Sequence, residues 1–225
     1  MYTISIIAQK GGVGKTTLAL SLAVAADQAR KQSVVIDLDP QASACNWSDR
    51  RSHETPIIVD AQPSRLASAL SRAEEAGVAF AFIDTPPRSE QAALAAAKAA
   101  DLVLIPSRPQ IYDLETIPNT IELLKLAGNT PAMVVLNAVP PRGTRHEQAR
   151  QALARFAMPV CPAMLTHRAA FGDAGTVGLT ALENDRNGKA AQEIRLVYKY
   201  TTKLLNELTR RESDNEQSRL IRSAS

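Results

Sequence analysis

The chain has 225 residues, of which 45% are hydrophobic and 22% charged, and this composition excludes a disordered or collagen-like chain. Its two cysteines, Cys45 and Cys161, lie far apart in the sequence, which excludes a disulfide-stapled scaffold, and no apolar run is long enough to span a membrane. The net charge of +3 is uneven, because residues 142–225 carry 14 Lys and Arg against 9 Asp and Glu, and this basic region allows an anionic partner.

Short apolar runs of strand length alternate with helical stretches along the chain. The runs are residues 3–8, 33–37, 56–59, 79–83, 102–106 and 132–136, and most are continuous rather than alternating. Continuous runs are typical of parallel strands that helices cover on both faces. With helical segments such as 63–76 and 112–127 as crossovers, the pattern predicts a single-domain α/β fold with a doubly wound, mostly parallel sheet, whose ligands bind at the carboxyl ends of the strands.

A glycine-rich loop follows the first apolar run and leads into a helix-like stretch. The loop reads Lys10-Gly11-Gly12-Val13-Gly14-Lys15-Thr16-Thr17. Between a strand and a helix, such a P-loop directs backbone N–H groups at a phosphate, Lys15 reaches the β- and γ-phosphates, and the Thr16 hydroxyl binds Mg²⁺. We therefore predict a P-loop NTPase fold with nucleotide bound by residues 11–17. The usual P-loop has glycine where this chain has Gln9, and the departure is a second lysine, Lys10, at the loop entrance.

Two later strands end in aspartates at the same edge of the predicted sheet. The second run closes on Asp37 and Asp39, which point the same way because they are two positions apart, and the fourth run closes on Asp84. Beside a P-loop, such carboxylates can hold Mg²⁺ or position the attacking water. The sixth run ends in Asn137, whose amide could read the adenine edge or cap the turn before a double proline, and the sequence leaves both roles open.

The last long helix is predicted over about residues 188–211, where apolar side chains form a stripe. The segment that follows is polar, and we expect it to be disordered. The predicted domain organisation is therefore a P-loop ATPase domain at residues 1–211 and a polar C-terminal tail at residues 212–225.

Taken in order, four motifs resemble those of the ParA/MinD family of deviant P-loop ATPases. They are Lys10 to Thr17, the segment Asp37-Leu38-Asp39-Pro40-Gln41, the segment Asp84-Thr85-Pro86-Pro87, and Asn137. The second motif looks most like that of the short ParA proteins that partition plasmids and chromosomes. The stretch from Thr166 to Phe171, continued by Gly178 and Glu183, is similar to the end of those proteins, so the resemblance covers about residues 1–205.

The resemblance implies a Mg²⁺-dependent ATPase that forms an ATP-sandwich homodimer, in which Lys10 crosses to the partner's nucleotide. A cation delivered in trans to the γ-phosphate acts as an arginine finger does. In this scheme Lys15 holds the phosphates and Asp39 orients the lytic water. The residues that support the metal are Thr16, Asp37 and Asp84. The family also implies that the ATP-bound dimer binds DNA, and that slow, partner-stimulated hydrolysis releases it, which segregates a plasmid or chromosomal cargo.

The expected partners are a second copy of the chain, non-specific DNA and a small centromere-binding adaptor of the ParB or ribbon-helix-helix kind. For the DNA contact, Arg195, Lys199 and Lys203 recur every four residues along the last helix, and Arg168 is another candidate. We expect contacts to phosphates alone, since nothing here reads a base sequence, and a solvated helix face is the alternative. Such a protein would be cytoplasmic and associated with the nucleoid.

Other readings of the sequence differ in the cargo or in the chemistry. A MinD-like ATPase at a membrane surface would need a C-terminal amphipathic helix, and residues 213–225 offer only Leu220 and Ile221 as bulky apolar side chains, so we expect no membrane partner. A metabolic ligase on this fold would not need Lys10, and an iron–sulfur reductase would need cluster thiolates that are absent. A ParA-like ATPase that positions a protein cluster stays open, because an adaptor reads the cargo.

Overall fold

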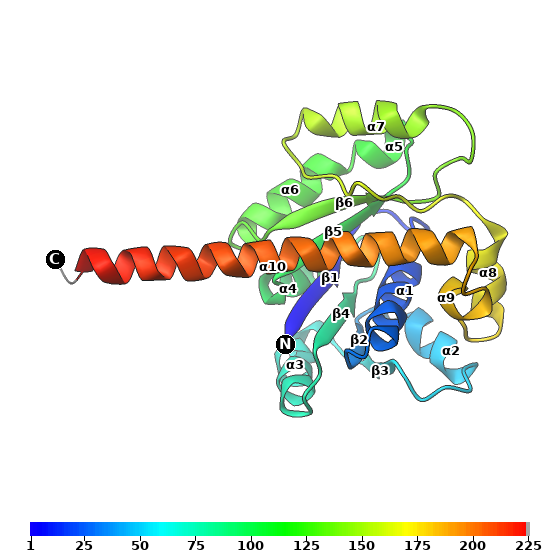
Figure 1. Cartoon of the computed structure of the whole chain (residues 1–225), viewed down its shortest axis with the longest axis horizontal. Coiled ribbons are helices and arrows are strands. Elements are labelled where there is room, and N and C mark those ends of the chain that lie inside the picture. Colours follow the sequence, from blue (N-terminus) through cyan, green and yellow to red (C-terminus); the bar gives the residue numbers. More distant parts are fainter. Residues whose placement is uncertain (224–225) are drawn as a thin grey trace.

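A six-stranded parallel sheet forms the centre of the molecule (Figure 1). The computed structural model describes the backbone of residues 1–223 and the side chains of residues 1–211, 213 and 214. The strands in this part of the chain are β1 (Tyr2–Ile6), β2 (Ser33–Asp37), β3 (Ile57–Asp60), β4 (Phe80–Asp84), β5 (Leu102–Ser107) and β6 (Ala132–Leu136), in the spatial order β3-β2-β4-β1-β5-β6. Every neighbouring pair is parallel, so the predicted doubly wound α/β fold is confirmed.

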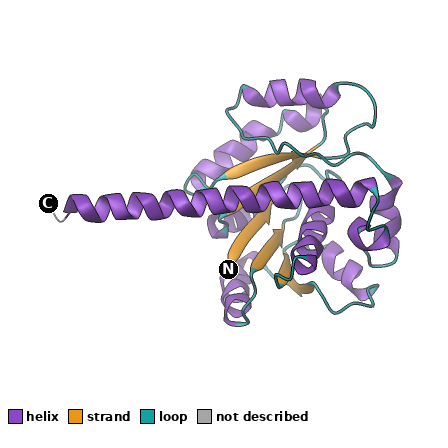
Figure 2. Ribbon diagram, in the orientation of Figure 1, coloured by secondary structure: helices purple, strands orange, loops and turns teal. Residues whose placement is uncertain are grey.

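Helices cover both faces of the sheet (Figure 2). One face packs against α1 (Lys15–Gln28), α2 (Ser43–Asp49), α8 (Ala169–Thr176), α9 (Ala181–Asn184) and α10 (Lys189–Ser223). The other face packs against α3 (Leu66–Glu75), α4 (Glu90–Ala99), α6 (Ile117–Leu126) and α7 (Arg145–Ala154), with the short elements η1 (Pro63–Arg65) and α5 (Ile111–Leu114) in the connections. Because the inner strands are buried on both faces, their side chains feed two separate cores, as the continuous apolar runs predict.

The carboxyl ends of the central strands lie in one row. Asp37 at the end of β2 is in register with Asp84 at the end of β4, and Asp84 is in register with Ile6 at the end of β1. The chain leaves β1 through the glycine-rich loop and enters α1 at Lys15. Strand register alone therefore brings the P-loop beside both aspartates.

Helix α10 is longer than the helix that the sequence predicts. It continues to Ser223 and projects well beyond the body of the molecule (Figure 1). We expected residues 212–225 to be disordered. Residues 212–223 are helical in the structure, because this segment contains neither Gly nor Pro and is rich in residues that tolerate a helix, and residues 224 and 225 lie outside the described residues. Among the described helices, none is both long and apolar enough to cross a membrane.

Candidate nucleotide site

The glycine-rich loop is a preformed turn at the start of α1. Gly12 and Gly14 have φ values of 71° and 90°, in the region that favours glycine. A side chain at Gly14 would also collide with the Nδ2 atom of Asn137, which donates a hydrogen bond to the carbonyl of Val13 at 2.7 Å. Asn137 therefore braces the P-loop from the end of β6. Its Oδ1 accepts from the backbone of Ala138 at 2.8 Å, which is the turn-capping contact that the sequence left open.

Lys15 lies at the floor of the loop. The residue is 7% exposed, and its Nζ donates to the carbonyl of Lys10 at 3.4 Å. Burial lowers the pKa of Lys15, although the carboxylates of Asp84 and Asp39 oppose that shift. A buried ammonium group at the N-terminus of a helix is arranged to receive an anion.

Asp84 is the carboxylate that fits a metal ion. It is fully buried, and neither of its oxygens has a hydrogen-bond partner among the described residues. Burial raises its pKa to about 7. The hydroxyl of Thr16 lies nearby and partly opposes that rise, but it does not form a well-aligned hydrogen bond with Asp84. An orphaned carboxylate beside a hydroxyl suits Mg²⁺, which in NTPase sites takes one or two protein oxygens, the nucleotide phosphates and water. The described residues contain no cluster of three His, Cys, Asp or Glu that would hold a metal without such a ligand.

Asp37 is occupied by the backbone of the segment that follows it. Its Oδ1 accepts from the N–H of Asp39 at 3.0 Å, and its Oδ2 accepts from Ala44 at 2.9 Å and Cys45 at 3.4 Å. Burial raises the pKa of Asp37, and these hydrogen bonds oppose the rise. In this structure Asp37 fixes the position of α2 and of the loop that carries Asp39.

A cavity of about 480 Å³ opens above the loop. This is the size of a site for a small organic ligand. The P-loop and the first turns of α1 line the cavity, together with Asp39, Ser43 and Trp47. Phe171, Gly175 and residues 179–181, from the C-terminal part of the chain, also line it. Phe171 belongs to the C-terminal stretch that the resemblance covers, so this stretch completes the site.

Lys10 does not line this cavity. Its Nζ lies 3.1 Å from Oδ1 of Asp113 and 5.6 Å from the ring centroid of Tyr112, and Lys10 borders a neighbouring cavity with Pro86 and Arg88. Asp113 also accepts from Nε of Arg108 at 2.6 Å. Burial opposes ionisation of Asp113, but its two cations outweigh that effect and lower its pKa.

Asp113 and Arg108 are functional candidates that the sequence patterns did not identify. They follow the carboxyl end of β5, in the same row as the other strand ends, and this position is the signal that could have found them.

The candidate DNA-binding residues divide into two groups. Arg195, Lys199 and Lys203 are exposed along α10. Arg195 donates to the carbonyl of Arg186 at 2.7 Å, and Lys203 lies 3.7 Å from Glu207, so both heads stay at the surface. Arg168 precedes α8, and its guanidinium is paired with Glu193 at 2.7 Å. The basic face of α10 therefore consists of the other three residues, without Arg168.

The chain is similar to several known proteins. Residues 4–181 match the family model of the CobQ/CobB/MinD/ParA nucleotide binding domain. The Maintenance of carboxysome distribution protein A of Gloeobacter kilaueensis is 33% identical over 198 residues, which cover 87% of this chain and 90% of the relative. The chromosome-partitioning ATPase Soj of Thermus thermophilus is 29% identical over 167 residues, 59% of this chain and 66% of the relative.

The fold is also similar to that of solved structures. The septum site-determining protein MinD of Pyrococcus horikoshii, solved as a complex with Mg-ADP, has a TM-score of 0.72 and 20% identity, and the match covers 92% of this chain and 98% of that chain. At this level of identity the likeness establishes the shared fold, and the residues described above carry the chemistry.

Proposed function

The chain belongs to the CobQ/CobB/MinD/ParA nucleotide-binding family, as its motifs predicted, and from this membership we propose that it is a ParA-like positioning ATPase. ParA/MinD members of the family are ATPases that bind ATP and Mg²⁺, as the resemblance implied. We propose that this chain dimerises around ATP, binds DNA without sequence preference in that state, and is released by slow hydrolysis that an adaptor stimulates.

The placement of Lys10 is the observation that carries this proposal. The side chain is 35% exposed and turned toward Asp113, outside the cavity above its own P-loop. A lysine that is partly exposed and lies outside this cavity can serve a second copy of the chain. This supports a catalytic site completed in trans, where a cation beside the γ-phosphate is worth roughly 10³–10⁵ in rate.

The other site residues have distinct proposed roles. Residues 11–17 cradle the phosphates through backbone N–H groups, and Lys15 neutralises their charge. Thr16 and Asp84 hold Mg²⁺, while Asp37 supports them by fixing α2. Asp39, on the loop at the edge of the cavity, orients the attacking water. Bound Mg²⁺ would neutralise charge that develops on the phosphates.

Two kinds of cargo fit the proposed positioning ATPase, and the similarity to known proteins favours one of them. The similarity to a carboxysome distribution protein extends over most of both chains and supports a large protein assembly as the cargo. The shorter similarity to Soj supports DNA segregation through a ParB-like or ribbon-helix-helix adaptor. Deleting the gene and following the cell's protein compartments and plasmid loss would separate these cargoes, because scattered compartments with normal plasmid inheritance support the first.

A salt-dependent gel shift on unrelated DNA tests the proposed switch. We expect a shift with ATP and Mg²⁺, none with ADP or without nucleotide, and an affinity that falls linearly with salt on logarithmic axes. Equal binding in all three nucleotide states would contradict the proposal. A shift that one DNA sequence competes away while unrelated sequences do not would contradict the phosphate-only contact.

A further inference from the structure

Helix α2 is anchored to the nucleotide site at its first turn. The N–H groups of Ala44 and Cys45 bind Oδ2 of Asp37, and the N–H of Asp39 binds Oδ1 of the same carboxylate. The carboxylate thus ties the start of α2 to the loop that carries Asp39. Any displacement of α2 is therefore passed to Asp39.

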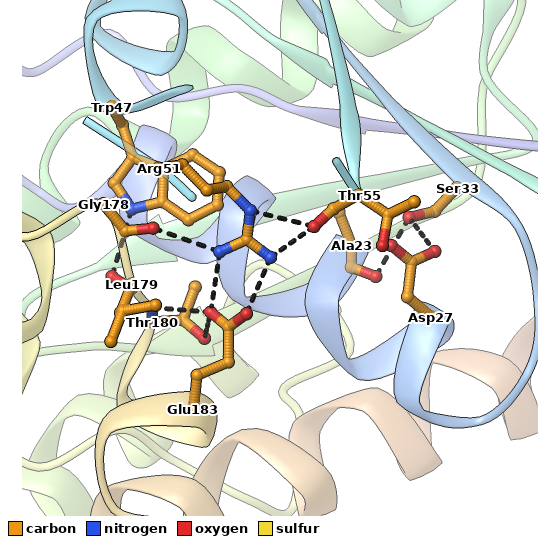
Figure 3. Close-up of polar contacts among 10 residues, drawn as sticks. All are labelled: Ala23, Asp27, Ser33, Trp47, Arg51, Thr55, Gly178, Leu179, Thr180 and Glu183. Atoms are coloured by element: carbon orange, nitrogen blue, oxygen red, sulfur yellow. Dashed lines mark hydrogen bonds and ion pairs between the residues drawn. The ribbon is translucent and has the colours of Figure 1, made fainter. Parts of the chain in front are cut away.

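Arg51, just beyond the end of α2, forms a second anchor (Figure 3). Its Nη2 lies 2.7 Å from Oε1 of Glu183, and its Nη1 donates to Oε2 of Glu183 at 3.2 Å and to the carbonyl of Gly178 at 3.1 Å. Its Nε donates to the carbonyl of Thr55 at 2.8 Å, and its guanidinium carbon lies 4.6 Å from the ring centroid of Trp47. With a side chain only 3% exposed, Arg51 is a desolvated cation held in one geometry by a two-pronged carboxylate contact.

The segment that receives Arg51 leads directly into residues that line the nucleotide cavity. Trp47 Nε1 donates to the carbonyl of Leu179 at 3.0 Å, and Thr180, next in the chain, lines the cavity. Glu183 completes a capping box with Thr180 at the start of α9. Arg51 and Glu183 are not among the residues that line the cavity, so the pair joins α2 to residues 178–183 from outside the cavity.

We propose that Arg51 and Glu183 are positioning residues that hold Asp39 in register with the γ-phosphate, and we name this pair the α2 clamp. The inference rests on the proposed function. The phosphates are bound by the P-loop, which the clamp does not touch, so nucleotide affinity should not depend on it. Hydrolysis should depend on it, because a misplacement of about 1 Å caused by a remote change can cost on the order of 10²-fold in rate.

Neutralising Glu183 with a matched control tests the clamp. Glu183→Gln removes the charge that faces Arg51, and Gln at this position can still serve the capping box. The control is Glu193→Gln, because Glu193 also accepts from an arginine at 2.7 Å but lies on α10, away from α2. For Glu183→Gln we expect kcat for ATP hydrolysis to fall at least about tenfold while the Kd of a fluorescent ATP analogue changes less than about twofold. Glu193→Gln should leave both values near those of the unmodified protein.

The intrinsic fluorescence of the protein gives a second readout. Trp47 is the chain's single tryptophan and packs directly against Arg51, so its emission reports on the clamp. We expect a red shift in Glu183→Gln and none in Glu193→Gln. Arg51→Lys, which keeps the charge but loses the two-pronged contact, should lower kcat by an intermediate factor.

The outcomes separate the clamp from the proposed function. The clamp is wrong if Glu183→Gln hydrolyses ATP normally, if its affinity and kcat fall together, or if Glu193→Gln behaves in the same way. If the unmodified protein neither binds nor hydrolyses ATP, the proposed function fails instead. In that case an unshifted Trp47 emission in Glu183→Gln would overturn the clamp independently.

Discussion

Among single residues, Asp84 shows most clearly how a residue of the nucleotide site lowers the stability of the folded protein. Its carboxylate is buried without a hydrogen-bond partner among the described residues, and burial raises its pKa to about 7, against about 3.9 for an exposed aspartate. Between these two pH values the folded protein keeps a proton that the unfolded chain has lost. With respect to Asp84, the free energy of unfolding is therefore highest below about pH 4, and it falls as the pH rises to about 7.

Asp84→Asn should therefore stabilise the nucleotide-free protein at alkaline pH. We expect the free energy of unfolding at pH 8 to rise by roughly 1–3 kcal/mol, and the difference to vanish toward pH 4. Urea unfolding at both pH values measures it. The control is Asp60→Asn, which changes the exposed aspartate that closes β3 in the same row and should have little effect. A variant that is less stable than the unmodified protein at pH 8 would contradict this account, because it would mean that the charged carboxylate of Asp84 stabilises the folded protein.

At the level of elements, the loop between α8 and α9 lies against the end of α2 with no room for a side chain. A Cβ at Gly178 would come within 2.6 Å of the backbone of Arg50 and of Arg51, and Gly178 has a φ of 67°. The loop can approach α2 closely only because this residue is glycine. This close approach explains why a glycine is needed at position 178, within the C-terminal stretch that resembles short ParA proteins.

Gly178→Ala should destabilise the protein more than the backbone conformation alone requires. Gly77→Ala is the matched control, because Gly77 has a φ of 77° and a Cβ added there would meet no other atom within 4 Å. We expect about 1 kcal/mol for the control, from the left-handed backbone, and about 3 kcal/mol for Gly178→Ala, from the added collision. Denaturant unfolding of both variants compares them, and equal losses would mean that the loop moves aside freely.

The exposed face of α10 is the element that we propose for DNA. Lys199→Ala should weaken binding to all DNA sequences alike and reduce the slope of log affinity against log salt by about 1, because one phosphate contact is lost. Lys125→Ala is the control, since this exposed lysine lies on α6 and pairs with Glu122 at 2.8 Å. Fluorescence anisotropy over a range of salt concentrations measures both slopes. If the two variants lose the same affinity, DNA binds elsewhere.

At the scale of the whole molecule, sequence patterns predict the sheet and the centre of the site because both follow from local order. The P-loop, Asp37 and Asp84 are found from apolar runs that end in polar residues, and parallel register then aligns those ends. No local pattern predicts contacts between distant loops. Asp113 is separated from Lys10 by about a hundred residues, and the Arg51–Glu183 pair joins residues 132 apart in the chain. The full length of α10 is not predicted either, because its last part is polar in sequence and gives no hydrophobic period to read.

For the molecule as a whole, we propose that each catalytic site is shared between two copies of the chain. Lys10 is held by Asp113, and Arg108 remains on Asp113 when Lys10 leaves, so the buried carboxylate keeps a counter-ion. A spare partner lowers the cost of moving Lys10, because an isolated buried charge is strongly destabilising. This arrangement supports the proposed transfer of Lys10 to a neighbouring copy.

Mixing two inactive variants tests this claim most directly. Lys10→Ala keeps its own phosphate site and Asp39, while Asp39→Ala keeps Lys10. The two variants are mixed before ATP is added, so that each mixed dimer that then forms contains one complete site. We expect each variant alone to be nearly inactive and an equal mixture to recover about a quarter of the unmodified rate, because about half of the dimers are mixed and each has one working site of two. A mixture as inactive as its components, or a Lys10→Ala protein that hydrolyses ATP normally on its own, would contradict a site completed in trans.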